Sequence, residues 1–225
     1  EKLPYFLDIP ELAVVKTASS NMEFCPEDLE IIDLLEDNSV DKALSLLNPE
    51  KSVLPSSLYK GGRMECLEKL KDFIEKKLCN YHNDRNDPNL DGVSGMSPYL
   101  HFGQISPLEI LFEVYKSKQQ DTEGGRAFIE EMVVRRELSI NFVYYNQNYD
   151  SFEGLPDWCK KTLKEHQNDV RQYVYSRQQL EEASTHDPYW NAAQNEMVKT
   201  GKMHGYMRMY WGKKILEWME SPEEA

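Results

Sequence analysis

The sequence predicts an all-α fold. Apolar residues recur at three- and four-residue steps through most of the chain, which is the period of an amphipathic helix. No segment of convincing length alternates apolar and polar residues as a half-buried strand does. With 225 residues, 40% of them hydrophobic, the chain is long enough and apolar enough to bury a sizeable core.

The first part of the chain predicts short helices and a loop. We expect helices at 26–36 and 39–47, separated by Asp37-Asn38, and a loop at 48–61. A longer helix follows Gly61-Gly62, and its apolar residues repeat at helical spacing: Met64, Leu67, Leu70, Phe73, Ile74 and Leu78. We assign residues 1–60 to an N-terminal helical and linker part and residues 61–225 to the main helical domain.

Capping signals predict the later helices. Ser106 and Glu109 form a capping-box pattern around Pro107, and Ser176 and Gln179 repeat it. Gly201 is placed to end a helix that Asp187-Pro188 begins. The expected helices are 107–118, 126–146, 157–167, 177–184, 188–200 and about 203–219.

Charge and cysteine content narrow the class of protein. The net charge of −13 alone argues against a nucleic-acid partner. Residues 196–218 reverse this balance, with Lys199, Lys202, Arg208, Lys213 and Lys214 against Glu196 and Glu217. That stretch is either a DNA-facing surface or an ordinary solvated helix face. The four cysteines are widely spaced and the histidines show no metal-ligand spacing, so we expect a reduced intracellular protein without a metal site.

Three local features carry candidate chemistry. Residues 92–98, GVSGMSP, form a Ser- and Gly-rich turn before a Pro, which suits either an anion such as a pyrophosphate or a plain capped loop. The helix at 126–146 combines charged and apolar residues on nearly every side, which indicates burial and a need for polar partners. Trp190, Trp211 and Trp218 fall at spacings that suit either core packing or an electron relay.

Several stretches together resemble class II cyclobutane pyrimidine dimer (CPD) DNA photolyases, of the photolyase and cryptochrome superfamily. The strongest is THDPYWNAAQNEMVKTGKMHGYMRMYWGKKILEW at 185–218. SGMSPYLHFGQIS at 94–106 and EEMVVRREL at 130–138 are similar to further motifs of that superfamily. The resemblance runs from about residue 48 and covers the family's helical FAD-binding domain.

The resemblance implies a U-shaped FAD and the residues that hold it. Tyr81 and the segment Val93, Ser94, Gly95, Met96 and Ser97 would hold the flavin phosphates, with Arg136 paired to them. Arg208 would lie near the isoalloxazine, where its charge favours the reduced anionic flavin, FADH⁻.

The resemblance also implies substrate and relay residues. Arg85, Glu131, Tyr175 and Met209 would surround a pyrimidine dimer flipped out of damaged DNA, and Glu131 would act in catalysis. Arg135 stands where some relatives have Trp. Trp190, Trp211 and Trp218 would relay electrons to oxidised flavin.

The implied function is light-driven splitting of the dimer, with FAD carrying the chemistry. The start at Glu1 without Met suggests a piece of a longer chain. The resemblance implies that this piece is truncated at its C-terminal end and is without the family's N-terminal α/β domain, which usually holds an antenna chromophore. We expect a monomer without a membrane segment, in the cytoplasm of a prokaryote or the nucleus of a eukaryote. A cryptochrome-like flavin photoreceptor and a cofactor-free helical interaction module are the alternatives.

Overall fold

The computed structural model describes residues 44–45, 55–56 and 58–225. The chain divides into two compact units, residues 1–55 and 56–225. Leu44 and Ser45, within the helix expected at 39–47, are helical; the rest of that helix, the helix expected at 26–36 and most of the loop expected at 48–61 lie outside the described residues. Residues 56–225 are described below as one unit.

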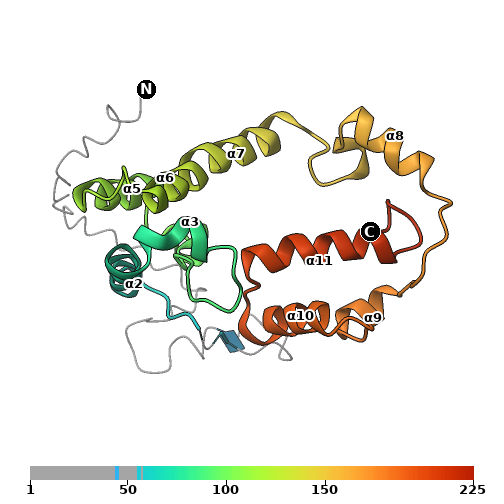
Figure 1. The fold of residues 1–225 in the computed structure, drawn as a ribbon, viewed down its shortest axis with the longest axis horizontal. Helices are drawn as coiled ribbons and strands as arrows, with labels where there is room; N and C mark the ends of the chain where they lie inside the picture. Colours follow the sequence, from blue (N-terminus) through green and yellow to red (C-terminus); the bar gives the residue numbers. More distant parts are fainter. Residues whose placement is uncertain (1–43, 46–54, 57) are drawn as a thin grey trace, which may run out of the picture. The chain divides into compact units, whose positions relative to one another are not determined.

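This unit is built from helices (Figure 1), and no strand occurs among its described residues. The α-helices are α2 (Arg63–Lys76), α3 (Tyr81–Asp84), α4 (Ser97–His101), α5 (Pro107–Lys116), α6 (Glu123–Ile129), α7 (Arg136–Tyr145), α8 (Asp157–Glu165), α9 (Arg177–Glu181), α10 (Pro188–Thr200) and α11 (Gly205–Trp218). Short 3₁₀ turns lie at Leu78–Asn80 and Phe152–Gly154, and Glu130–Arg135 is a π-helical segment between α6 and α7. The all-α prediction is confirmed.

The expected helix boundaries hold best where a cap defines them. The side chains of Ser176 and Gln179 form the complete capping box of α9. α10 begins at Pro188 and ends before Gly201, whose φ of 75° lies in the left-handed region. At α5 only half of the expected box forms, because the Ser106 hydroxyl accepts from the N–H of Leu108 while Glu109 pairs with Arg63 instead.

The first hydrophobic core joins α2, α3, α4, α5 and α6. Its buried residues are Cys66, Leu70, Phe73, Ile74, Leu78, Tyr81, Met96, Tyr99, Ile105, Ile110, Val114 and Phe128. α6 packs directly on α3. α6 also packs on the 3₁₀ turn Leu78–Asn80. Gly124 permits this second approach, because a Cβ there would lie 1.8 Å from the carbonyl oxygen of Leu78.

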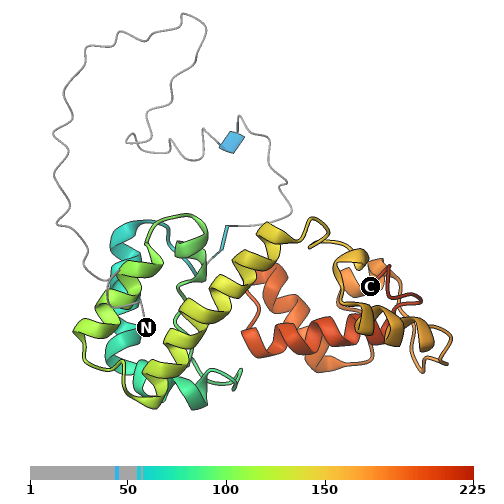
Figure 2. The ribbon, with the colours of Figure 1, turned by 90° about the horizontal axis from the view of Figure 1, so that it is seen from above.

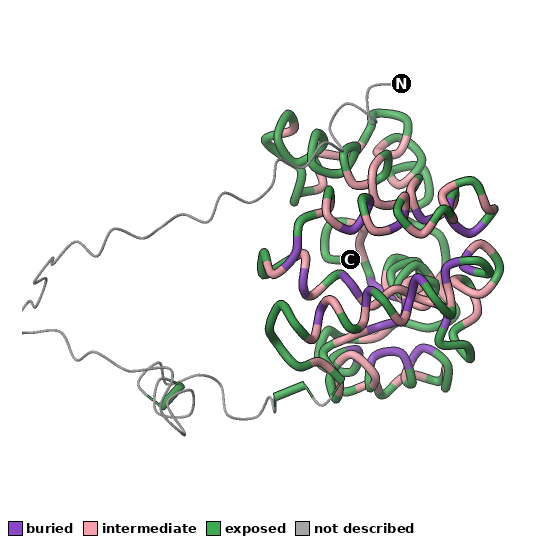
Figure 3. The backbone as a smooth tube through the Cα atoms, turned by 90° about the vertical axis from the view of Figure 1, so that its left-hand side faces the viewer, coloured by how far each residue is buried: buried purple, intermediate pink, exposed green. Residues whose placement is uncertain are grey.

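The second core joins α9, α10 and α11. Leu180, Trp190, Trp218 and Met219 are its buried residues. α10 and α11 run side by side in Figures 1 and 2 and pack on each other. Figure 3 shows buried and exposed positions alternating along the helices, as amphipathic segments require.

The helix expected at 126–146 begins three residues earlier, at Glu123, and continues through the π-helical segment into α7 (Figure 2). The expectation that it is buried holds for Phe128 in α6. It is wrong for α7, since neither core contains a residue of that helix and Tyr145 is 77% exposed.

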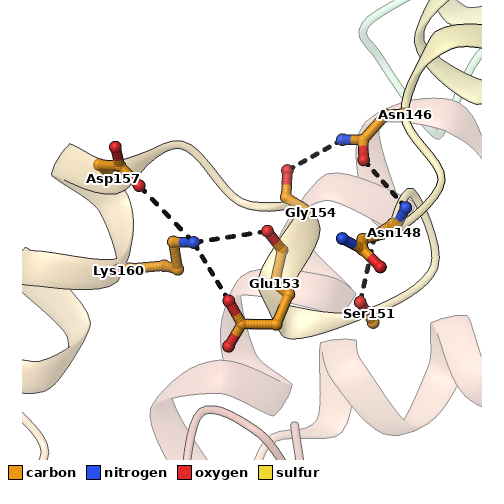
Figure 4. A network of polar contacts seen from close by, with 7 residues as sticks. All are labelled: Asn146, Asn148, Ser151, Glu153, Gly154, Asp157 and Lys160. Atoms are coloured by element: carbon orange, nitrogen blue, oxygen red, sulfur yellow. Dashed lines mark hydrogen bonds and ion pairs between the residues drawn. The ribbon is translucent and has the colours of Figure 1, made fainter.

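The turn that follows α7 is held by polar contacts (Figure 4). The Asn146 amide donates to the carbonyl of Gly154 and accepts from the N–H of Asn148. Lys160 of α8 contacts Glu153 at 3.3 Å and Asp157 at 3.6 Å. These contacts fix how α8 leaves the turn.

Candidate functional site

A cavity of about 1160 Å³ lies within residues 56–225. This volume exceeds the range of roughly 300–1,000 Å³ that is usual for small-molecule sites, so the cavity suits a dinucleotide-sized ligand. Its lining contains every residue predicted to hold a cofactor: Tyr81, Val93, Ser94, Gly95, Met96, Ser97, Arg136 and Arg208. Three of the four predicted substrate residues, Arg85, Glu131 and Met209, also line it.

The loop at 92–98 supplies one wall of the cavity. Gly92 is buried so closely against Asp84 that a Cβ would lie 2.5 Å from the Asp84 Cβ. Gly95 has a φ of 68°, which favours glycine. The buried Met96 anchors the loop in the first core. Ser94 and Ser97 on this wall bring hydroxyl groups to the cavity lining.

Two donors hold the carboxylate of Glu131 at the cavity lining. Glu131 accepts a hydrogen bond from the Tyr81 hydroxyl and pairs with Arg85 at 2.5 Å. Burial, and then the hydrogen bond to Glu131, raise the pKa of Tyr81. The Arg85 guanidinium lies 5.7 Å from the centre of the Tyr81 ring. Because Glu131 engages the Tyr81 hydroxyl here, the phosphate contact expected of Tyr81 stays a prediction.

The π-helical segment carries Glu131 and is followed at once by Arg136. π-Helical turns inside α-helices occur frequently at functional sites. Arg135 lies 3.9 Å from Glu131, and Arg136 lies 3.7 Å from Glu137. Glu131, Arg135 and Arg136 therefore enter the cavity lining from one continuous stretch of helix.

Arg208 reaches the lining from the first turn of α11. It makes no ion pair with any residue of the described part of the chain. Together with Arg136, it leaves the cavity with positive charge that protein carboxylates do not fully match. Such a cavity suits an anionic ligand.

The three predicted tryptophans lie together in the second core. The rings of Trp190 and Trp211 stack with centroids 6.0 Å apart and planes 6° apart. The Trp190 and Trp218 centroids are 5.7 Å apart. The indole N–H of Trp190 donates to the carbonyl of Trp211, and that of Trp211 to Gln194. Both the core role and the relay role are compatible with this arrangement.

Tyr175 does not line the cavity, unlike the other predicted substrate residues. Its hydroxyl accepts from the backbone N–H of His186 and lies 2.7 Å from the Nδ1 atom of that residue. Its ring meets Trp218 edge-on, with centroids 5.4 Å apart. The structure puts Tyr175 beside the tryptophans, because its backbone N–H donates to the carbonyl of Trp218 at the end of α11. The substrate contact expected of Tyr175 stays a prediction.

Sequence reasoning missed part of the site. The connection from α10 to α11 contributes Lys202 and Met203 to the cavity lining, and the start of α11 contributes Tyr206. Its only sequence signal was Gly201, which marks a sharp change of direction. Among the described residues, no group of acidic, Cys or His side chains could hold a metal ion, and no helix is long and apolar enough to cross a membrane.

Comparison with known proteins gives the family. No family model matches the chain. A protein named deoxyribodipyrimidine photo-lyase from Methanothermobacter thermautotrophicus is 53% identical over 174 residues, 76% of this chain and 38% of the relative. A protein of the same name from Potorous tridactylus is 44% identical over 225 residues, all of this chain and 40% of the relative. The chain belongs to the photolyase and cryptochrome superfamily.

A solved superfamily structure supports the fold. A bacterial class III photolyase from Agrobacterium tumefaciens matches with a TM-score of 0.53 at 20% identity, over 74% of this chain and 36% of the solved chain. The chain spans 38% and 40% of the lengths of the two curated photolyase relatives named above.

Proposed function

We propose that this chain forms the FAD-binding part of a class II photolyase, which repairs cyclobutane pyrimidine dimers in DNA under light. The observation that carries the proposal is a single cavity that gathers the Ser94–Ser97 loop, Arg136, Arg208 and the Glu131 cluster. The names of the relatives support the reaction, and the stretch at 185–218 supports the class.

The cavity residues fit a flavin dinucleotide. Ser94, Ser97 and Arg136 would hold the two phosphates, because hydroxyl and guanidinium donors suit a diphosphate. Arg208, free of an ion pair in the described part of the chain, would lie beside the flavin ring. There its positive charge would favour the anionic reduced state. When bound, reduced FAD supplies an electron to the dimer after absorbing light.

Glu131 would act on the substrate. Tyr81 and Arg85 hold one oxygen each of its carboxylate, which fixes the orientation of the group. Glu131 would accept a hydrogen bond from a pyrimidine edge, while Met209 would offer an apolar, polarizable contact. A dimer already distorts the duplex, so its extrusion into a cavity costs less than that of an intact pair.

DNA would approach the side of α11. Lys213 and Lys214 lie on this helix, and Lys202 precedes it. Local positive charge of this kind holds phosphates even on a protein whose net charge is negative. An antenna chromophore would belong to another part of a full-length photolyase.

The proposal is tested by the absorption spectrum of the purified chain after incubation with FAD, followed by repair of an oligonucleotide that carries one dimer. We expect flavin bands to remain after gel filtration and dimers to disappear only under blue or near-UV light. Arg136→Ala should weaken FAD binding about ten- to hundredfold, the value of one charge-assisted hydrogen bond. Arg126→Ala, an exposed arginine outside the cavity, is the control.

Two results would favour other functions. Bound flavin without light-dependent loss of dimers would indicate a cryptochrome-like photoreceptor. A chain that folds cooperatively but binds no FAD would indicate a helical interaction module.

A further inference from the structure

His204 lies immediately before α11, in the connection from α10. The residues on either side of it, Met203 and Gly205, line the cavity. Its side chain is buried, with the residue 6% exposed, and its Nδ1 atom accepts a hydrogen bond from the N–H of Tyr206 at 3.2 Å. The imidazole therefore occupies the N-cap position of α11, where Ser, Thr, Asp or Asn is usual.

This contact fixes the protonation state of His204. A neutral imidazole accepts at one nitrogen and donates at the other, whereas a protonated one donates at both. Because Nδ1 accepts, the proton sits on Nε2. That N–H is buried and has no acceptor among the described residues. An ionised Asp cap would carry no donor, so the unpaired Nε2–H is a cost that comes with a histidine at this position.

The rest of the connection is already held. The backbone N–H of His204 donates to the Glu196 carboxylate at 3.3 Å. The Thr200 hydroxyl donates to the carbonyl of Glu196 at 2.7 Å and accepts from the N–H of Lys202 at 3.2 Å. These bonds tie the last turn of α10 to the connection. The His204 ring then links the connection to α11, because it accepts the hydrogen bond from the N–H of Tyr206.

Arg208 depends on that first turn. Its backbone N–H donates to the carbonyl of His204 at 2.9 Å, which closes the first helical turn. Its guanidinium lies over Gly205, 3.7 Å from the place a Cβ would take there. We infer that His204 is a positioning residue, whose neutral imidazole fixes the first turn of α11 and thereby holds Arg208 and Met209 at the cavity. The consequence for flavin binding rests on the proposed function, whereas the cap itself does not.

The inference predicts a dependence on pH. Burial above all, and also Lys202 and Arg208, lower the pKa of His204, while Glu196 of α10 and Asp87 after α3 act in the opposite direction. In the unfolded chain a histidine takes up a proton as the pH falls through about 6.5. In the folded chain His204 stays neutral until the pH falls to its lower, folded pKa. The stabilisation is therefore complete above about pH 6.5 and is lost as the pH falls toward the folded pKa.

Three variants of the 225-residue chain test the role of His204. His204→Asn keeps a capping acceptor but does not titrate, and His204→Leu removes the acceptor. His166→Asn makes the same change at an exposed histidine, which pairs with Asp169. Melting temperatures are measured without flavin at pH 7.5 and pH 5.5, and FAD dissociation constants are measured by fluorescence at pH 7.5.

We expect the Asn variant at 204 to bind FAD within about twofold of the parent and the Leu variant about fivefold more weakly, as for loss of a typical cap. The melting temperature of the Asn variant should fall less between pH 7.5 and pH 5.5 than that of the parent or the His166 control. A Leu variant that does not fold, beside an Asn variant that does, also supports the cap.

Two outcomes would overturn the inference. One is an Asn variant whose melting temperature responds to acid as the parent does. The other is equal FAD affinity in the Asn and Leu variants. If the parent chain binds no FAD, the proposed function fails, but the melting temperatures still decide whether His204 caps α11.

Discussion

The hydroxyl of Tyr210 donates a hydrogen bond to Asp187, the residue whose carboxylate also caps the start of α10. Tyr210 belongs to α11, so one carboxylate both begins a helix and joins it to its neighbour. The two helices carry the stacked pair Trp190 and Trp211. The geometry of the tryptophans therefore depends on this junction.

The contact between Asp187 and Tyr210 should make the free energy of unfolding depend on pH in the acid range. Burial alone would raise the pKa of Asp187, but hydrogen bonds from Tyr210 and from the N–H groups of Trp190 and Tyr189 lower it overall. The same carboxylate raises the pKa of Tyr210 to about 12. A lowered carboxyl pKa stabilises the fold above the unfolded value of about 3.9, and the effect is lost as the pH falls through the folded pKa.

Asp187→Asn should therefore lower the free energy of unfolding by about 1 kcal/mol at pH 7 and flatten its decline below about pH 4. Tyr210→Phe should cost about 1 kcal/mol through the lost hydrogen bond. Urea denaturation across pH 3–7 measures both changes. An Asn variant with the acid response of the parent would contradict the assignment.

Gly124 should tolerate no side chain. Gly124→Ala would force a Cβ to 1.8 Å from the carbonyl oxygen of Leu78, so α6 must move away from the first core. We expect a loss of at least about 3 kcal/mol, seen by thermal denaturation. Gly212→Ala is the control, since nothing lies within 4 Å of its Cβ position in α11. That change should stabilise the chain by about 0.5–1 kcal/mol, because alanine favours a helix more than glycine does.

Trp218→Phe tests the relay. Trp218 is buried against Trp190 and lies outside the cavity lining, so flavin binding should persist. Light-driven reduction of oxidised flavin should slow, as followed by absorbance under steady illumination. Trp158→Phe, at a residue 73% exposed, should leave the rate unchanged. Normal photoreduction in the Trp218 variant would remove that residue from the relay.

Lys213 and Lys214 should differ as DNA contacts. Lys214 already pairs with Glu217 at 2.9 Å and lies 5.5 Å from the Trp218 ring, whereas Lys213 is exposed. Lys213→Glu should weaken DNA binding and reduce the slope of log affinity against log salt by about one or more, because it removes a phosphate contact. Fluorescence anisotropy at several salt concentrations measures this slope. An unchanged slope would exclude Lys213 as a phosphate contact.

The sequence predicted those parts of the fold that local chemistry decides. Asp187-Pro188 and Gly201 bound α10 because capping and a left-handed glycine act within a few residues. The start of α6 was placed three residues late, because two adjacent glycines usually interrupt a helix. Here Gly124 and Gly125 serve close packing against Leu78 and Gln119 instead. That reason depends on tertiary contacts, which a local pattern does not contain.

In the candidate site, too, some features were predicted from sequence motifs and others depend on tertiary contacts. Family motifs predicted that Ser94, Arg136 and Arg208 share a cavity, and the structure brings them together. The pairing of Tyr81 with Glu131 joins residues fifty positions apart, and the place of Tyr175 follows from its backbone bond to Trp218. The spacing of residues along the chain predicts neither the Tyr81–Glu131 pair nor the Tyr175–Trp218 pair. His204 was overlooked as a cap because histidine is an unusual residue at that position.

The π-helical segment at Glu130–Arg135 makes the length of this helix matter as much as its composition. A π turn holds one more residue than an α turn, and removing that residue would let an unbroken α-helix form with no loss of helix propensity. Every position beyond the deletion would turn by about 100° around the axis. Arg136 would then face away from Glu131 and the cavity. Single-residue insertions and deletions in this segment should thus be far more harmful than most substitutions.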